Sequence, residues 1–213
     1  MRAVLIVNPN ATSTTPAGRD LLAHALESRV SLSVVHTDHR GHAIEIAEAA
    51  KSDGIDVIIV HGGDGTVNEV VNGLLGRPGP ERPAVETLPA VAVVPGGSAN
   101  VFARALGISP EPVEATNQLI DLLGERQGGA PWRRIGLMDC AERWAVFTAG
   151  MGVDGDVVAA VEAQRAKGRK VTAGRYMRIA FREMLSGVRT EPLLTLHLPD
   201  REPAPGVHFA FVS

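Results

Sequence analysis

The sequence predicts a parallel, doubly wound α/β domain over residues 1–128. A β-rich second domain is expected to begin at residue 129 and to be incomplete at residue 213. Short apolar runs alternate with amphipathic segments in the order β-α-β-α-β-α with short loops, which is typical of a parallel sheet covered by helices. Two of the apolar runs lead directly into glycine-rich turns that open helices, at residues 62–66 and 95–98. After residue 131 the pattern changes to short strands joined by tight turns, which predicts the second domain.

The composition is that of an ordinary globular protein, with 45% hydrophobic and 21% charged residues in a chain of 213. A net charge of −3 gives no indication of bulk nucleic-acid binding. The single cysteine, Cys140, excludes an internal disulfide and favours a reducing cytoplasm, and we expect its side chain to be buried beside a strand. No apolar run reaches the length of a membrane span, so any contact with lipid is expected to be peripheral.

The first domain is expected to contain four strands. The third strand holds an unbroken apolar run at Val57–Val60, which indicates burial on both faces of the sheet. In the helix that follows, Val67, Val70, Val71 and Leu74 share one face at i, i+3, i+4 and i+7. The expected strands are residues 2–7, 31–36, 56–61 and 90–94, and the expected helices begin near Pro16, His42, Val67, Ala99 and Val113.

The second domain is expected to open with a hairpin after a glycine-containing boundary at residues 124–131. A third glycine-rich turn, two helices and a second hairpin follow in the pattern. The basic tract between residues 165 and 178 is typical of a solvated loop, with a surface for lipid headgroups as the alternative. In order, the expected elements are a hairpin of 132–139 with 143–149, a turn at 150–156, helices around 157–165 and 175–185, and a hairpin of 193–198 with 207–212.

The turn after the third strand is a candidate anion site. Gly62, Gly63 and Gly65 let a ligand approach the backbone closely, and the helix that follows favours negative charge at its first turn. Asp64 is unusual in such a turn: it could help hold Mg²⁺, accept a proton from an attacking hydroxyl, or cap the following helix. Thr66 has the same alternatives of phosphate ligand or cap.

A second turn repeats this pattern one strand further on. Gly96, Gly97 and Ser98 follow the fourth strand, and right-handed crossovers place both turns at the carboxyl edge of the sheet. Together the turns can hold one extended polyphosphate. Asn8 and Thr37 end the first two strands at the same edge and are placed to contact a nucleotide. Neither a Walker A loop nor a dinucleotide fingerprint is present. The polar residues Asn68, Glu69 and Asn72 lie off the apolar helix face, where a solvated surface is the simpler interpretation.

Four sequence blocks resemble the diacylglycerol kinase catalytic domain family. They are VNPNAT at 7–12, HGGDGTVNEVVNGLLG at 61–76, VVPGGSANVFARALGI at 93–108 and GMGVDGDVV at 150–158. More narrowly, the blocks are similar to the bacterial soluble lipid kinases, which are related to sphingosine and ceramide kinases. GGDGT alone also occurs in NAD kinases, whereas PGGSANVFAR is typical of the lipid branch.

The resemblance implies ATP-dependent phosphorylation of a lipid hydroxyl with Mg²⁺. It also implies an NAD kinase-like first domain, a β-sandwich second domain and ATP in the cleft between them. Asp64 would lie by the phosphates as catalytic residue and Mg²⁺ ligand, while further metal and catalytic residues of the family would lie beyond residue 213. The implied nucleotide contacts are Asn8, Pro9, Asn10, Thr12, Thr37, Gly62, Gly63, Asp64, Gly65, Thr66, Asn68, Glu69, Gly96, Gly97 and Ser98.

The expected partners are ATP and a diacylglycerol-like lipid. The expected location is the cytoplasm, with peripheral contact at the membrane surface, no nucleic acid, and a homodimer as one alternative for the oligomeric state. Two other functions stay open from the sequence. One is an NAD kinase-like enzyme that uses the same GGDGT turn, and the other is a nucleotide-binding module without turnover.

Overall fold

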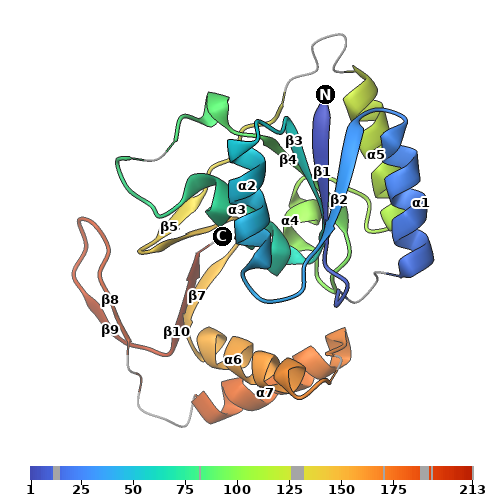
Figure 1. Ribbon diagram of the computed structural model, residues 1–213. Coiled ribbons are helices and arrows are strands. Elements are labelled where there is room, and N and C mark those ends of the chain that lie inside the picture. The colour runs from blue at the N-terminus through green and yellow to red at the C-terminus, as the bar shows by residue number, and fades with distance from the viewer. Residues whose placement is uncertain are drawn as a thin grey trace. The chain divides into compact units, whose positions relative to one another are not determined.

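A four-stranded parallel sheet forms the centre of the first of two compact units (Figure 1). The computed structural model describes residues 1–11, 15–81, 83–125, 132–169, 171–187, 192 and 194–212. The strand order is β2-β1-β3-β4. In the ladder, Val7 pairs with His36 and His61, and Gly62 pairs with Pro95, so all four strands end at one edge. The strands are β1 (Arg2–Val7), β2 (Ser31–His36), β3 (Val57–Gly62) and β4 (Ala90–Pro95).

Helices cover both faces of this sheet, so the predicted doubly wound α/β fold is confirmed. Alternate residues of β1 point to opposite sides, with Leu5 in the core against α1 and α5 and Ile6 in the core against α2 and α3. Both side chains are fully buried. The helices are α1 (Pro16–Glu27), α2 (His42–Ser52), α3 (Asp64–Leu75), α4 (Val101–Ala105) and α5 (Pro112–Glu125), with a 3₁₀ turn, η1, at Val85–Thr87.

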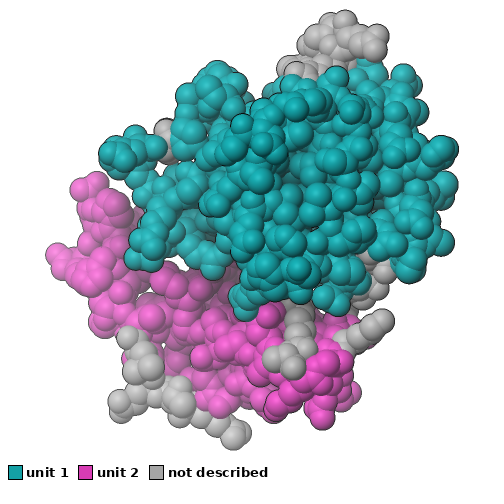
Figure 2. All heavy atoms as spheres, viewed as in Figure 1, with its two compact units in different colours: residues 1–147 teal, residues 148–213 magenta. Residues whose placement is uncertain are grey.

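A short hairpin belongs to the first unit rather than to the second. Strands β5 (Met138–Cys140) and β6 (Arg143–Ala145) pair as predicted, and Trp144 is buried in the same core as α3. The compact unit therefore extends to Phe147, and the second unit covers 148–213 (Figure 2). The predicted boundary at residues 128–129 lies outside the described residues. Cys140 is exposed, so the expectation that it is buried was wrong.

The second unit contains two helices and two small antiparallel sheets. β7 (Ala149–Gly152) leads directly into α6 (Val153–Ala166), which is followed by α7 (Ala173–Gly187). The predicted glycine-rich turn at 150–156 is therefore wrong, because these residues form a strand and the first turn of a helix. Gly152 is required here, since its φ is +73° and an added Cβ would lie 2.3 Å from the His208 carbonyl oxygen.

The pairing of the last strands also differs from the prediction. β8 (Leu194–Leu196) pairs with β9 (Ala204–Val207), while β10 (Phe209–Val212) pairs with β7. The predicted strand over 207–212 is divided at His208, whose carbonyl accepts the Val153 N–H at 3.1 Å. A β-rich sandwich for the second domain stays a prediction. Within the described residues, no helix is long and apolar enough to span a membrane.

Candidate functional site

The two predicted glycine-rich turns touch each other at the carboxyl edge of the sheet. The Gly96 N–H donates to the Gly62 carbonyl at 2.9 Å. A Cβ added to Gly97 would lie 2.6 Å from the Cα of Gly63, and one added to Gly63 would lie 3.3 Å from the Cα of Gly97. Real Cβ atoms do not approach a backbone atom to 2.6 Å, so position 97 requires glycine. The turns therefore form one continuous backbone surface.

Several backbone donors of this surface have no acceptor. Over the ranges that the structure describes, no hydrogen bond is made by the N–H groups of Gly63, Asp64, Gly65 or Ser98. Three of them belong to the start of α3, where the first N–H groups of a helix lack intrahelical partners. Gly65 and Ser98 are exposed, so a ligand can reach them. The edge has the donors and the positive helix end that an anion requires.

The Asp64 carboxylate links the two turns. Its Oδ2 accepts the N–H of Val101 and its Oδ1 accepts the N–H of Phe102, each at 3.0 Å. Those donors open α4, so Asp64 caps a helix that begins 37 residues later rather than α3, its own helix. A carboxylate offers about four lone-pair sites. Two are used by α4, and the others are available to a ligand, a proton or a cation.

Asn100 closes the second turn from within, and the sequence analysis did not select it. Its Oδ1 accepts the Gly97 N–H at 2.9 Å and its Nδ2 donates to the Gly97 carbonyl at 2.8 Å. The residue lies in the left-handed region at φ 46° and ψ 47°. Asn tolerates this conformation better than other non-glycine residues. An Asn shortly after a glycine pair was therefore the sequence signal that could have identified Asn100 as part of the turn.

Asn8 joins the end of β1 to the first turn of α3. Its backbone N–H donates to the His61 carbonyl at 3.0 Å, and its Nδ2 donates to the Thr66 hydroxyl at 3.1 Å. Its Oδ1 accepts the Asn10 N–H at 2.9 Å, which fixes the turn out of the strand. Pro9 and Asn10 are exposed beside these contacts. The structure thus brings the predicted first loop to the glycine-rich turns, while Thr12 lies outside the described residues.

Thr37 and Glu69 hold the neighbouring loop that follows β2. Thr37 is buried, and its N–H donates to the Val7 carbonyl at 2.9 Å. The Glu69 Oε1 accepts the Gly41 N–H at 3.1 Å, at the left-handed residue that opens α2. Both residues therefore lie near the predicted edge, but Thr37 bonds the end of β1 and Glu69 bonds this loop, and neither of these hydrogen bonds goes to the glycine-rich turns.

The polar side of α3 is not a solvated surface, so that interpretation of Asn68, Glu69 and Asn72 was wrong. All three are partly buried. Asn72 pairs with the backbone of Trp144 in both directions, accepting its N–H at 2.9 Å and donating to its carbonyl at 2.9 Å. The Asn68 Oδ1 is buried, and no described group donates to it.

His61 is a second residue that the sequence analysis did not select. It is the last residue of β3 but one, directly before Gly62, and only 2% of its surface is exposed. Burial lowers the pKa of His61, and the opposing contribution from its Nδ1 contact with the Val94 carbonyl at 3.2 Å is smaller. The imidazole therefore favours the neutral form and contributes structure rather than positive charge at this edge.

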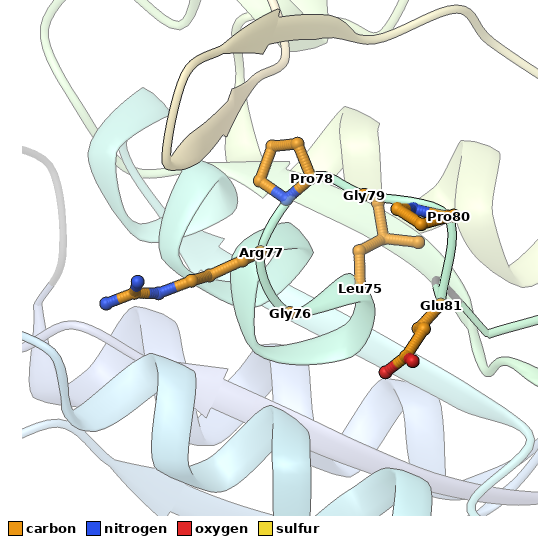
Figure 3. A pocket seen from close by; sticks show the side chains of 7 residues that line it. All are labelled: Leu75, Gly76, Arg77, Pro78, Gly79, Pro80 and Glu81. Carbon is orange, nitrogen blue, oxygen red and sulfur yellow. The ribbon is translucent and has the colours of Figure 1, made fainter.

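A hollow of about 390 Å³ lies at the other end of α3 (Figure 3). A 12-residue helix is about 18 Å long, which separates this hollow from the glycine-rich turns. None of the predicted site residues lines it. Its lining comes from the loop after α3, namely Leu75, Gly76, Arg77, Pro78, Gly79, Pro80 and Glu81.

The part of the chain that contains the two glycine-rich turns is similar to known proteins. The family model for the "Diacylglycerol kinase catalytic domain" matches residues 2–126. A Chromohalobacter salexigens protein named "Probable lipid kinase YegS-like" is 40% identical over 111 residues, covering 52% of this chain and 33% of that protein. The Escherichia coli O127:H6 protein named "Probable lipid kinase YegS" is 32% identical over 117 residues, covering 55% and 36%.

Solved structures are also similar to this chain. A crystal structure described as a diacylglycerol kinase from Bacillus anthracis is 32% identical, with a TM-score of 0.49, and the match covers 56% of this chain and 42% of that one. The chain spans 33% and 36% of the length of the two curated relatives above.

Proposed function

The chain belongs to the diacylglycerol kinase catalytic domain family, and from this premise we propose that it takes part in ATP-dependent phosphorylation of a lipid. In this proposal the γ-phosphoryl group of ATP is transferred to the hydroxyl of a diacylglycerol-like lipid. Residues 1–147 supply the nucleotide-binding part, with the phosphates over the two touching turns.

The observation that carries the proposal is the contact between Gly63 and Gly97. A phosphate chain needs backbone donors, space beside the backbone and a positive helix end. The touching turns offer all three, because no side chain stands between them and the N–H groups of Gly63, Asp64, Gly65 and Ser98 are free of acceptors within the described residues. Asn8, directly after β1, borders this surface through its hydrogen bond to Thr66 in the first turn of α3. These residues fit the phosphates of ATP.

Asp64 is proposed as the catalytic residue of the turns. The two bonds to the start of α4 fix the plane of its carboxylate, so its unused lone pairs are oriented before a substrate arrives. Those lone pairs fit a bound Mg²⁺, which takes one or two carboxylates together with substrate phosphates. When bound, Mg²⁺ would neutralise charge on the phosphates. The same lone pairs could instead accept the proton of the lipid hydroxyl.

We propose that α7 makes the peripheral membrane contact. Met177, Phe181 and Met184 lie on one face at i, i+4 and i+7, and their exposed fractions are 65%, 65% and 50%. Arg178 and Arg182 are also exposed on this helix. An exposed apolar face with neighbouring arginines suits the surface of a membrane that contains anionic lipid. Vesicle flotation should show more binding to anionic than to neutral vesicles, and the double variant Met177→Ser, Phe181→Ser should lose it.

A phosphotransfer assay tests the function directly. Purified protein is incubated with γ-labelled ATP and Mg²⁺, and diacylglycerol, sphingosine, phosphatidylglycerol and NAD are offered separately. Labelled product from a lipid supports the proposal, and product from NAD alone would replace it with the NAD kinase reading. ATP binding without any product would support a binding module. Asp64→Asn should abolish turnover, whereas Asp121→Asn, an exposed carboxylate on α5, should not change it.

A further inference from the structure

The loop between β2 and α2 carries a second cluster of chemical groups that the proposed kinase reaction does not use. Asp38 and His39 follow the end of β2, and His42 is the first residue of α2. One ligand atom from each of the three side chains lies within 4.8 Å of the others. We propose that Asp38, His39 and His42 form a binding site for a divalent transition-metal ion of the zinc type, separate from any Mg²⁺ at Asp64.

The three side chains converge on a single oxygen. Asp38 Oδ1 lies 2.8 Å from His42 Nδ1 and also contacts His39 Nδ1. The two imidazole rings are stacked, with centroids 4.8 Å apart and planes inclined by 8°. Atoms bound to a tetrahedral zinc ion at about 2.0–2.2 Å stand about 3.3–3.6 Å apart. Small rotations of these side chains are therefore enough to close them on one ion.

The contacts of His42 favour a cation between the groups. Its Nδ1 lies 3.2 Å from the Asp38 backbone N, which can only donate, as well as 2.8 Å from the carboxylate oxygen, which can only accept when ionised. One nitrogen cannot accept from the first and donate to the second at once. When Nδ1 accepts the Asp38 N–H, two acceptor atoms, this nitrogen and the carboxylate oxygen, lie 2.8 Å apart with no proton between them. A metal ion bound to both atoms would replace the Asp38 N–H as the partner of Nδ1 and remove this repulsion.

Glu45 supplies the outer contact that a metal-binding histidine requires. Its Oε1 lies 3.2 Å from His39 Nε2, the ring nitrogen that points away from the cluster. Metal-bound histidines usually donate their second ring N–H to a carboxylate, which fixes the tautomer and the ring orientation. This carboxylate is one turn into α2, so the helix itself positions it.

The donor types select the metal. Two imidazole nitrogens and one carboxylate oxygen suit Zn²⁺, Ni²⁺ or Cu²⁺, whereas Mg²⁺ and Ca²⁺ prefer oxygen ligands throughout. Three protein ligands leave a fourth position open to water or another ligand. The side chains of Asp38 and His39 are 74% and 53% exposed, so an ion can enter from solvent. His42, 22% exposed, anchors the site on the rigid start of α2.

Backbone geometry keeps the cluster in place. Gly41 has a φ of +91°, a left-handed conformation that turns the chain back so that His42 stands beside Asp38. The Glu69 carboxylate holds this turn through the Gly41 N–H. The loop is therefore fixed by α3 independently of the three proposed ligands.

Zinc titration of the protein without an affinity tag tests the proposal. Calorimetry should show one saturable Zn²⁺ site per chain, and Co²⁺ should give a visible absorption band from nitrogen and oxygen ligands. His39→Gln and His42→Gln should each weaken Zn²⁺ binding by more than about tenfold, and Glu45→Gln by about tenfold. Mg²⁺ at a large excess should not compete.

His24→Gln is the matched control, because His24 is an exposed histidine that also faces a carboxylate, Glu27 at 3.7 Å. It should leave Zn²⁺ binding unchanged. Circular dichroism of each variant establishes that it is folded, and Asp38→Asn, which retains the side-chain shape, provides a second test at the shared oxygen. Equal Zn²⁺ affinity in the wild type and in His39→Gln, or equal losses in His24→Gln and His39→Gln, would overturn the site.

Discussion

Gly97 lies so close to Gly63 that a methyl group on it would stand 2.6 Å from the Gly63 Cα. Gly97→Ala must push the two turns apart, and overpacking of this kind costs about 1–3 kcal/mol of unfolding free energy. We expect both a lower urea midpoint and a loss of ATP binding.

Gly65→Ala is the matched control, because its Cβ would meet no atom within 4 Å. It should leave the midpoint unchanged or raise it, while a methyl on the exposed ligand side should still weaken ATP binding. Equal midpoints for the two variants would contradict the steric account.

Asp64→Ala should reduce stability as well as turnover. The substitution removes the acceptors for the N–H groups of Val101 and Phe102 at the start of α4. Leaving such groups without partners costs about 1–3 kcal/mol. Chemical denaturation measures this loss. Asp121→Ala on α5 should cost much less, because that exposed carboxylate makes no hydrogen bond within the described part of the chain. Inactive Asp64→Ala with wild-type stability would show that the capping bonds contribute little.

His61 should make the protein less stable at mildly acidic pH. Its pKa is lowered in the folded state by burial, whereas a histidine in the unfolded chain titrates near about 6.5. Below that pH the unfolded chain binds more protons, so stability falls as pH drops from about 6.5 toward the folded pKa, by at most about 1.4 kcal/mol per pH unit. Above that range His61 contributes no pH dependence.

Urea midpoints at several pH values between 8 and 5 test this expectation. His61→Gln should be less stable than the wild type at pH 8, and the difference should shrink as the pH falls. His24→Gln, which changes an exposed histidine, should follow the wild type throughout. A constant difference between the wild type and His61→Gln at every pH would exclude a contribution from this imidazole.

Asn72→Ala should release the β5–β6 hairpin from α3. The substitution removes both hydrogen bonds to the Trp144 backbone, at a cost of about 1–3 kcal/mol. Trp144 is 8% exposed, so its fluorescence should shift to the red as it meets water, against the constant signal of the exposed Trp132. Faster hydrogen exchange at the Trp144 amide is the second readout. An unchanged emission maximum would mean that apolar packing alone holds the hairpin.

The first domain could be predicted from the sequence because its signals are local. Apolar runs marked β1 and β2 with the bounds that the structure has, and Pro16 marked the start of α1. Distant pairing was not predictable in the same way. Nothing in residues 207–212 indicates that β10 pairs with β7, 60 residues earlier, rather than with its neighbour in sequence.

The sequence predicted where the backbone turns of the candidate site lie. It did not predict which side chains bond the site to other elements. Glycine pairs after apolar runs located both turns. Apolar periodicity, however, reports which face of α3 meets the core and is silent on polar side chains that bond the backbone of another element. For this reason Asn72 could not be distinguished from a solvated residue, and Val101 could not be identified as a partner of Asp64.

The polar side of α3 also sets an order for assembly on the ribosome. Glu69 bonds a residue 28 positions earlier in the chain, whereas Asp64 and Asn72 bond residues 37 and 72 positions later. The Asp64 cap therefore cannot form until Phe102 has emerged, and the Asn72 contacts must wait for Trp144. A nascent chain that ends before these residues holds α3 with part of its polar groups unmatched, so the ligand edge becomes complete only after most of the first unit has been synthesised.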